Sequence, residues 1–325
     1  MNTKIPFIWS NDDITIGLSE PMQRQLDFLA RWDLKGTFFV VPLLRRKDPE
    51  GRIRPTPLTN DPGLISLIKA AMRDGHDAHQ HSVTHACEEN GTADLRMFDL
   101  MGDGAKVQYS NERFVFERIW EVDAIEAHIG WGRKVWTEAF GAPSEGYRPG
   151  CGAFCGNMYT ACERLGFKWV SARVVSMTGW MWAARHLDYP VRLEGPGRPF
   201  RQGKLMEFPI LDDVAFRIPR ADVDRFVDLG WQHWQKCVER RFPFLLVSHH
   251  FALAHDEGTG YAIHEKLLPR ILDTGLAEPM TISEYYRRVE AGEFPMADKA
   301  DLYPDADMIP SWHALHPSNL PSSRR

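Results

Sequence analysis

Short apolar runs alternate along the chain with segments in which apolar positions recur every three or four residues. The runs over residues 5–9, 36–41, 167–172 and 244–248 predict buried strands. The helical spacing predicts helices over residues 20–31, 62–74 and 116–140. Alternating strands and helices indicate an α/β protein whose parallel sheet is either open or closed into a barrel.

Three segments do not follow this alternation. Residues 86–116 are polar and contain glycine, which predicts a long loop that acts as a lid or a specificity insertion. Residues 187–202 are rich in Pro, Gly and Arg and predict a surface excursion. Residues 291–325 are rich in Pro and Ser and predict an extended tail. We therefore expect one domain over residues 1–290, followed by the tail.

Composition and charge argue against some classes of protein. The chain has 325 residues and a formal net charge of −5, which argues against a dedicated nucleic-acid binder. The apolar run over residues 242–247 is too short to cross a bilayer, and the first residues lack the apolar stretch of a signal peptide. Five cysteines without framework spacing predict reduced thiols. We expect a cytoplasmic protein without a transmembrane segment.

Polar residues follow the predicted strands, at the end where α/β folds place their ligands. Asp12 and Asp13 come directly after the first strand, although such a pair also suits a turn or a helix N-cap. His81 and His85 have the i, i+4 spacing that places two imidazoles on one face of a helix, as a metal site requires. These four residues are candidate metal ligands or acid–base groups.

Two further segments carry candidate chemistry. Residues 146–152 form a Gly- and Pro-rich turn around Arg148, which could hold a carboxylate or be a plain surface turn. His249 and His250 close the last strong strand, where a histidine acts as a general acid or base or is a satisfied core residue. Each segment alone is a weak signal, and their order along the chain is the specific feature.

In that order the segments resemble the motifs of polysaccharide deacetylases of the NodB-homology class, carbohydrate esterase family 4. The family pattern runs T-F-D-D, then H-[ST]-x-x-H, R-x-P-[YF]-G, an Asp motif and a late Leu-x-x-His. The corresponding segments are residues 10–13, 81–85, 148–152 and 246–249. Residues 34–40 and 73–77 are similar to two supporting segments of the family, and the resemblance covers about residues 5–255.

The resemblance implies a distorted (β/α) barrel that binds one divalent metal ion. The implied ligands are Asp13, His81 and His85, and three protein ligands leave open positions for water and substrate. Zinc is the foremost candidate, and the same ligand set also suits Co, Ni, Mn or Fe.

The resemblance also implies catalytic roles. Asp12 would be the general base that takes a proton from the attacking water, and Arg148 would hold it ionised. The backbone N–H of Cys151 would stabilise the oxyanion. His249 would protonate the departing amine. His250 is the alternative if the late Leu-x-x-His motif aligns one residue further along the chain.

Some positions depart from the family pattern. Three substitutions are Asn11 for Phe, Gly150 for Pro and Cys151 for an aromatic residue. The fourth motif, D-x-x-D-W, is missing, and residues 176–180 stand in its place. Its Asp normally supports the Arg or the His, and Asp212 or Asp213 could substitute for it.

The resemblance therefore predicts a metal-dependent hydrolase that removes an N-acetyl or N-formyl group from an amino sugar. The expected substrate is a nucleotide- or lipid-linked sugar from cell-surface glycan or lipopolysaccharide O-antigen biosynthesis. One alternative is a metal-independent amidohydrolase resembling allantoinases, which the complete Asp-His-His set argues against. The other is a catalytically inactive glycan-binding relative, supported only by the missing fourth motif. The sequence leaves the oligomeric state open.

Overall fold

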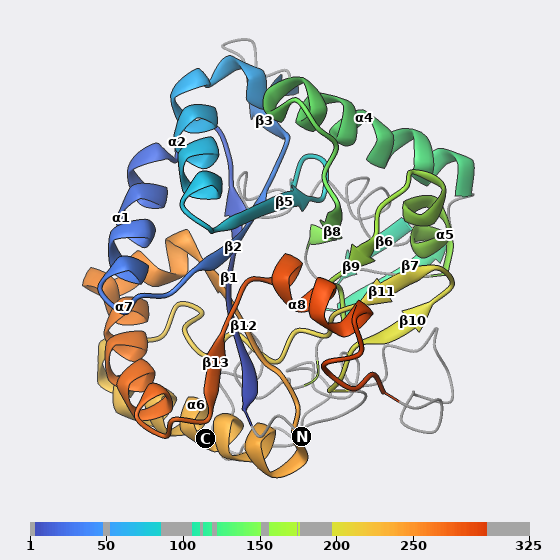
Figure 1. Ribbon diagram of the computed structural model, residues 1–325. Coiled ribbons are helices and arrows are strands. Elements are labelled where there is room, and N and C mark those ends of the chain that lie inside the picture. The colour runs from blue at the N-terminus through green and yellow to red at the C-terminus, as the bar shows by residue number, and fades with distance from the viewer. Residues whose placement is uncertain are drawn as a thin grey trace.

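A nine-stranded, curled sheet with helices around it organises the molecule (Figure 1). The computed structural model describes residues 4–47, 53–85, 106–110, 113–118, 122–150, 156–173, 175 and 197–297. The strand order is β10-β11-β9-β8-β5-β2-β1-β12, with β13 paired to β1. The strands are β1 (Ile5–Ile14), β2 (Gly36–Val40), β5 (Asp77–His81), β8 (Gly146–Arg148), β9 (Trp169–Val170), β10 (Phe200–Gln202), β11 (Leu205–Glu207), β12 (Phe244–His249) and β13 (Ala277–Pro279).

Helices pack around this sheet, most of them on its outer face and the last one against the interior of the barrel. They are α1 (Ser19–Ala30), α2 (Pro62–Arg73), α4 (Val122–Phe140), α5 (Gly156–Arg164), α6 (Val223–Arg240), α7 (His250–Leu272) and α8 (Ile282–Glu290), with short 3₁₀ turns η1 (Leu58–Asn60) and η4 (Arg220–Asp222). Two separate hairpins pair β3 (Leu43–Lys47) with β4 (Ile53–Pro57), and β6 (Lys106–Ser110) with β7 (Arg113–Arg118). Among the described helices, none combines the length and apolar character that a membrane span needs.

The predicted elements agree with the structure in type and differ mainly at their ends. β1 continues through the polar residues to Ile14, because β12 pairs with it as far as Asp12 and β2 pairs with it at Ile14. The predicted helix over residues 116–140 begins at Val122, since residues 113–118 belong to β7. The strand β6 and most of β7 lie within the predicted insertion 86–116, whose remaining residues fall outside the described part. The predicted tail is described only as far as residue 297.

Residues 208–213 connect the region beyond β9 to β12 across the curled sheet. The amide of Ile210 donates to the carbonyl of Arg173, just beyond β9, over 2.7 Å. The next amide, that of Leu211, donates to the carbonyl of Leu245 in β12, also over 2.7 Å. This closing segment turns the sheet into the distorted barrel that the resemblance implies, and it brings its last residues, Asp212 and Asp213, to the carboxyl end of β12.

The alternation of side chains along each strand separates the barrel interior from the helical layer. On β1, Phe7 and Trp9 belong to the core under the helices, whereas Ile8 belongs to a second cluster inside the barrel. Tyr285 of α8 packs on Phe208 in that second cluster, with ring centroids 5.3 Å apart. The interior is therefore apolar toward the end at which α8 packs.

The same alternation brings polar residues together at the carboxyl ends of the strands. The inward series on β1 continues from Ile8 to Asp12, and the parallel register sets Asp12 opposite His249 of β12. In the same way, the register of β5 and β8 sets His81 opposite Arg148. Four of the candidate residues thus meet at one end of the barrel, because strand pairing places them there.

Candidate active site

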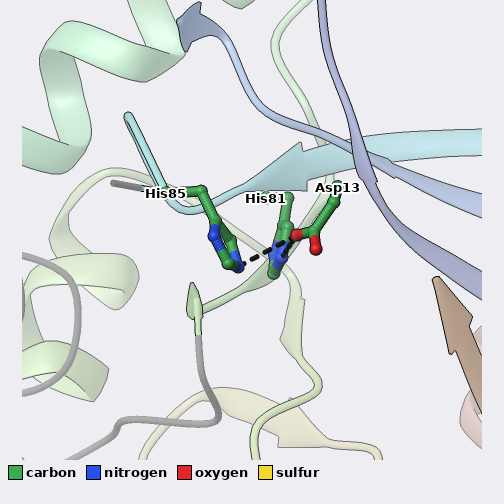
Figure 2. A group of neighbouring side chains, drawn as sticks. All are labelled: Asp13, His81 and His85. Carbon is green, nitrogen blue, oxygen red and sulfur yellow. Dashed lines mark hydrogen bonds and ion pairs between the residues drawn. The ribbon is translucent and has the colours of Figure 1, made fainter. Parts of the chain in front are cut away.

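Asp13, His81 and His85 form a compact buried cluster at this end of the barrel. The carboxylate oxygen Oδ1 of Asp13 lies 3.1 Å from Nε2 of His81 and 2.9 Å from Nε2 of His85. One ligand atom from each residue lies within 4.8 Å of the others, and Figure 2 shows the three side chains pointing toward one another. This geometry suits a shared ion.

Unusual backbone conformations create the cluster. The register between β1 and β2 shifts between Asn11 and Ile14, and Asp13 has a φ of 68° in the left-handed region. A bulge of this kind re-aims a side chain, so that Asp13 joins the inward-facing Asp12. Ser82 and His85 also have positive φ, at 51° and 37°. Non-glycine residues adopt this region at an energetic cost that folded proteins retain mainly at functional sites.

The predicted placement of the histidine pair on one helix face is wrong. His81 is the last residue of β5, and His85 lies in the bend that follows it. The left-handed turn at Ser82 reverses the chain and brings the second imidazole back toward the first. The two imidazoles therefore meet because a tight turn separates them, and not because they share a helix face.

The donor set fits a divalent metal ion. Nδ1 of His81 lies 3.0 Å from the carbonyl oxygen of Arg148 and can donate to it, so Nε2 would be the ligand atom for a metal ion. Burial alone would raise the pKa of Asp13, but the charge of His85 and the hydrogen bonds from both histidines hold it well below its usual range. One ionised carboxylate and two imidazoles are ligands that zinc and similar ions bind.

Asp12 is held beside this cluster by Arg148. Nη1 of Arg148 donates to Oδ1 of Asp12 over 2.6 Å and to Oγ of Ser10 over 3.0 Å, and Nη2 donates to Oγ of Ser171 over 2.9 Å. The other oxygen of Asp12, Oδ2, lies 3.9 Å from Nε2 of His81. Both Asp12 and Arg148 are buried, so the ion pair fixes the carboxylate at the edge of the metal cluster.

His249 is paired with Asp213, which the closing segment brings to it. Its Nδ1 lies 2.7 Å from Oδ2 of Asp213, and both side chains are buried. Burial lowers the pKa of His249, but the hydrogen bond to Asp213 and the negative charges of Asp13, Asp213 and Asp12 outweigh it and raise the pKa to about 9. The imidazole is therefore protonated at neutral pH and can donate a proton from Nε2.

The other predicted site residues occupy different positions. Asp212 faces α6, where its Oδ2 lies 3.5 Å from Nε2 of buried His233. His250 is the first residue of α7, and burial lowers its pKa to about 4, so it is neutral near pH 7. Cys151 lies outside the described residues, as do residues 176–180.

Several neighbours of the site escaped the sequence reasoning. Ser10 and Ser171 fix the guanidinium of Arg148, and each lies in or just after a predicted strand, which is the signal that could have found them. Phe216 and Phe251 pack their rings against His249, with centroids 5.1 and 5.3 Å away. No pattern in the sequence connects these two residues, because Phe216 lies in a turn before α6 and Phe251 in the first turn of α7.

Comparison with known proteins finds likeness in structure alone. No protein-family model and no curated protein matches the sequence. A candidate polysaccharide deacetylase from Mycobacterium smegmatis has a similar structure, with a TM-score of 0.59 and 15% identity over 94% of this chain and 96% of that one. A family 4 acetyl xylan esterase from Clostridium thermocellum, solved with a cobalt ion, gives a TM-score of 0.46 and 12% identity over 92% and 100% of the two chains. The first likeness confirms the predicted deacetylase-type fold.

Proposed function

We propose that this protein is a metal-dependent amide hydrolase that removes an N-acetyl or N-formyl group from an amino sugar of a cell-surface glycan. The main support for this proposal is that three sets of side chains lie together at one end of the barrel. They are a three-residue metal cluster around Asp13, the ion pair of Asp12 with Arg148, and the pair of His249 with Asp213. The structural likeness to a candidate polysaccharide deacetylase supports the choice of substrate class.

Each group has a distinct task in amide hydrolysis. Asp13, His81 and His85 would hold the metal ion, which supplies Lewis acidity at the scissile carbonyl. Asp12, held by Arg148, accepts a proton from the attacking water.

His249 and Asp213 complete the reaction at the leaving group. An amide nitrogen leaves readily only when it is protonated, and the imidazolium of His249 supplies that proton from Nε2. Asp213 accepts the hydrogen bond from Nδ1, which orients the ring and stabilises its positive charge. We assign the backbone N–H of Cys151 to the developing oxyanion, as the resemblance implies.

Release of acetate or formate from N-acylated amino sugars tests the proposed function. The purified protein should hydrolyse at least one such sugar, lose that activity after treatment with a chelator, and regain it when Zn²⁺ or Co²⁺ is added. Hydrolysis that survives complete metal removal would favour a metal-independent amidohydrolase. Sugar binding without any hydrolysis by the metal-loaded protein would favour an inactive glycan-binding protein.

Replacing Asp213 by Asn should move the alkaline limb of the pH–rate profile to lower pH. In the wild type the pKa of His249 is about 9, so the general acid is lost only as the pH rises through that value. The variant lacks the negative charge, while burial still lowers the pKa of the imidazole. We expect kcat to decline at a pH at least about 1 unit lower, which a kcat–pH profile measures.

Asp224→Asn is the matched control for this experiment. Asp224 is exposed on α6, pairs with Lys266 over 2.6 Å and is not among the carboxylates that raise the pKa of His249. Its replacement should leave the alkaline limb in place. An unchanged limb in the Asp213 variant would show that this carboxylate does not set the pKa of the acid.

A further inference from the structure

An exposed guanidinium stands over the aromatic rings that enclose His249. The central carbon of Arg217 lies 4.7 Å from the ring centroid of Phe251 and 5.4 Å from that of Phe216. Those two rings are in turn packed on the imidazole of His249, at 5.1 and 5.3 Å. Arg217 is therefore separated from the imidazole of the proposed general acid by a single layer of aromatic rings.

The backbone holds Arg217 in place at a conformational cost. Arg217 has a φ of 51°, in the left-handed region that disfavours side chains with a Cβ. On its carboxyl side, the carbonyl of Ile218 accepts a hydrogen bond from Oγ1 of Thr259, and the amide of Arg220 donates to Oδ2 of Asp256, each over 2.7 Å. The loop is thus fastened to α7 where the helix is interrupted at residues 255–258.

The two arginines of this loop differ in their partners. Arg220 pairs with Glu257 over 2.7 Å, so its charge is used within the protein. Arg217 makes no ion pair with a residue in the described part of the chain. Stacking occupies the planar face of a guanidinium and leaves its N–H edge available, and that edge matches the two oxygens of a carboxylate or phosphate.

We propose that Arg217 binds an anionic group, a phosphate or a carboxylate, on the amino sugar whose amide is hydrolysed. This inference rests on the proposed function and specifies its substrate class. The aromatic rings hold the guanidinium one ring layer away from the proposed acid, so the anion would lie at that distance from the acyl-amino group. Arg217 is then a specificity residue, and it takes no part in the proton transfers.

Three probe sugars test this inference. They are N-acetylglucosamine 1-phosphate, N-acetylmuramic acid with its carboxylate, and the uncharged methyl glycoside of N-acetylglucosamine. The wild type should show a kcat/KM about tenfold higher for at least one anionic sugar than for the uncharged one, since a hydrogen bond to a charged group contributes at least roughly this factor. Preference for the phosphate or for the carboxylate identifies the source of the anion, and either result supports the inference.

Arg217→Gly and Arg217→Gln should abolish this preference. Glycine adopts the left-handed conformation freely, so the first variant removes the side chain without backbone strain. Arg31→Gln is the control. Arg31 is an exposed arginine stacked on Phe28 at 5.1 Å, at the end of α1 that precedes β2 and hence at the opposite end of the strands. Equal kcat/KM for all three sugars in the wild type, or a preference that persists in Arg217→Gly, would overturn the inference.

Calorimetric titration of the metal-free protein separates this inference from the proposed function. Tighter binding of an anionic sugar by the wild type, weakened about tenfold in Arg217→Gly, supports the role of Arg217 even if no sugar is hydrolysed. Hydrolysis of all three sugars with equal affinity for them would instead support the proposed function and reject the role of Arg217.

Discussion

Replacing His81 and His85 together by alanine should reduce the bound divalent metal from about one ion per chain to none. The cluster has three ligand atoms, and the double variant retains only the carboxylate of Asp13. A single carboxylate does not hold a transition metal ion against dialysis, so hydrolysis should fall by at least about a thousandfold as well. Elemental analysis of protein purified without chelator measures the first effect, and acyl release measures the second.

A variant of a different histidine is the control that distinguishes loss of the metal site from loss of nonspecific metal binding. His255 is exposed and lies outside the cluster, so His255→Ala should keep both the metal and the activity. Thermal unfolding of the metal-free forms shows whether the double variant is folded. A folded double variant that keeps its metal would exclude this cluster as the binding site.

Asp12→Asn should leave the metal in place and reduce kcat by about 10²–10⁴, the usual contribution of a general base. The amide oxygen of asparagine can still accept the hydrogen bond from Arg148, so the packing of the site is retained. The amide cannot accept a proton from water, which is why turnover and metal content should respond differently. Metal analysis and steady-state kinetics on the same preparation test this separation.

Asp33→Asn is the control for the loss of a carboxylate. Asp33 is exposed and already has a φ of 51°, a conformation that asparagine tolerates. Its replacement should change neither metal content nor kcat. If the Asp12 variant turned over at the wild-type rate, the base would have to be another group, and if it lost its metal, Asp12 would be a ligand.

The sequence could predict the position of those candidate residues that follow regular strands. Asp12, His81, Arg148 and His249 each stand at the carboxyl end of a strand, and parallel pairing brings such positions together without any further information. The hydrophobic runs predicted the central strands for the same reason, since a strand buried on both faces is apolar along its length.

What the sequence did not determine depends on contacts between distant segments. The hydrogen bond of Asp213 to His249 requires residues 208–213 to cross between β9 and β12, and no periodic pattern marks that path. For this reason Asp212 and Asp213 were equivalent candidates until the structure separated them. The turn between His81 and His85 cannot be predicted from the spacing, because two residues at i and i+4 are equally far apart in sequence on a helix and across a tight reversal.

The segment that closes the barrel also affects how the folded protein meets other chains. An open strand edge offers unpaired N–H and C=O groups, which recruit strands from neighbouring molecules and start aggregation. Along β12 this edge is occupied, because Leu211 donates to Leu245 and the amide of Val247 donates to the carbonyl of Asp212. At the opposite end of the strand order, β10 contributes an edge of only three residues. The stretch that supplies Asp213 to His249 therefore also protects the sheet against intermolecular strand addition.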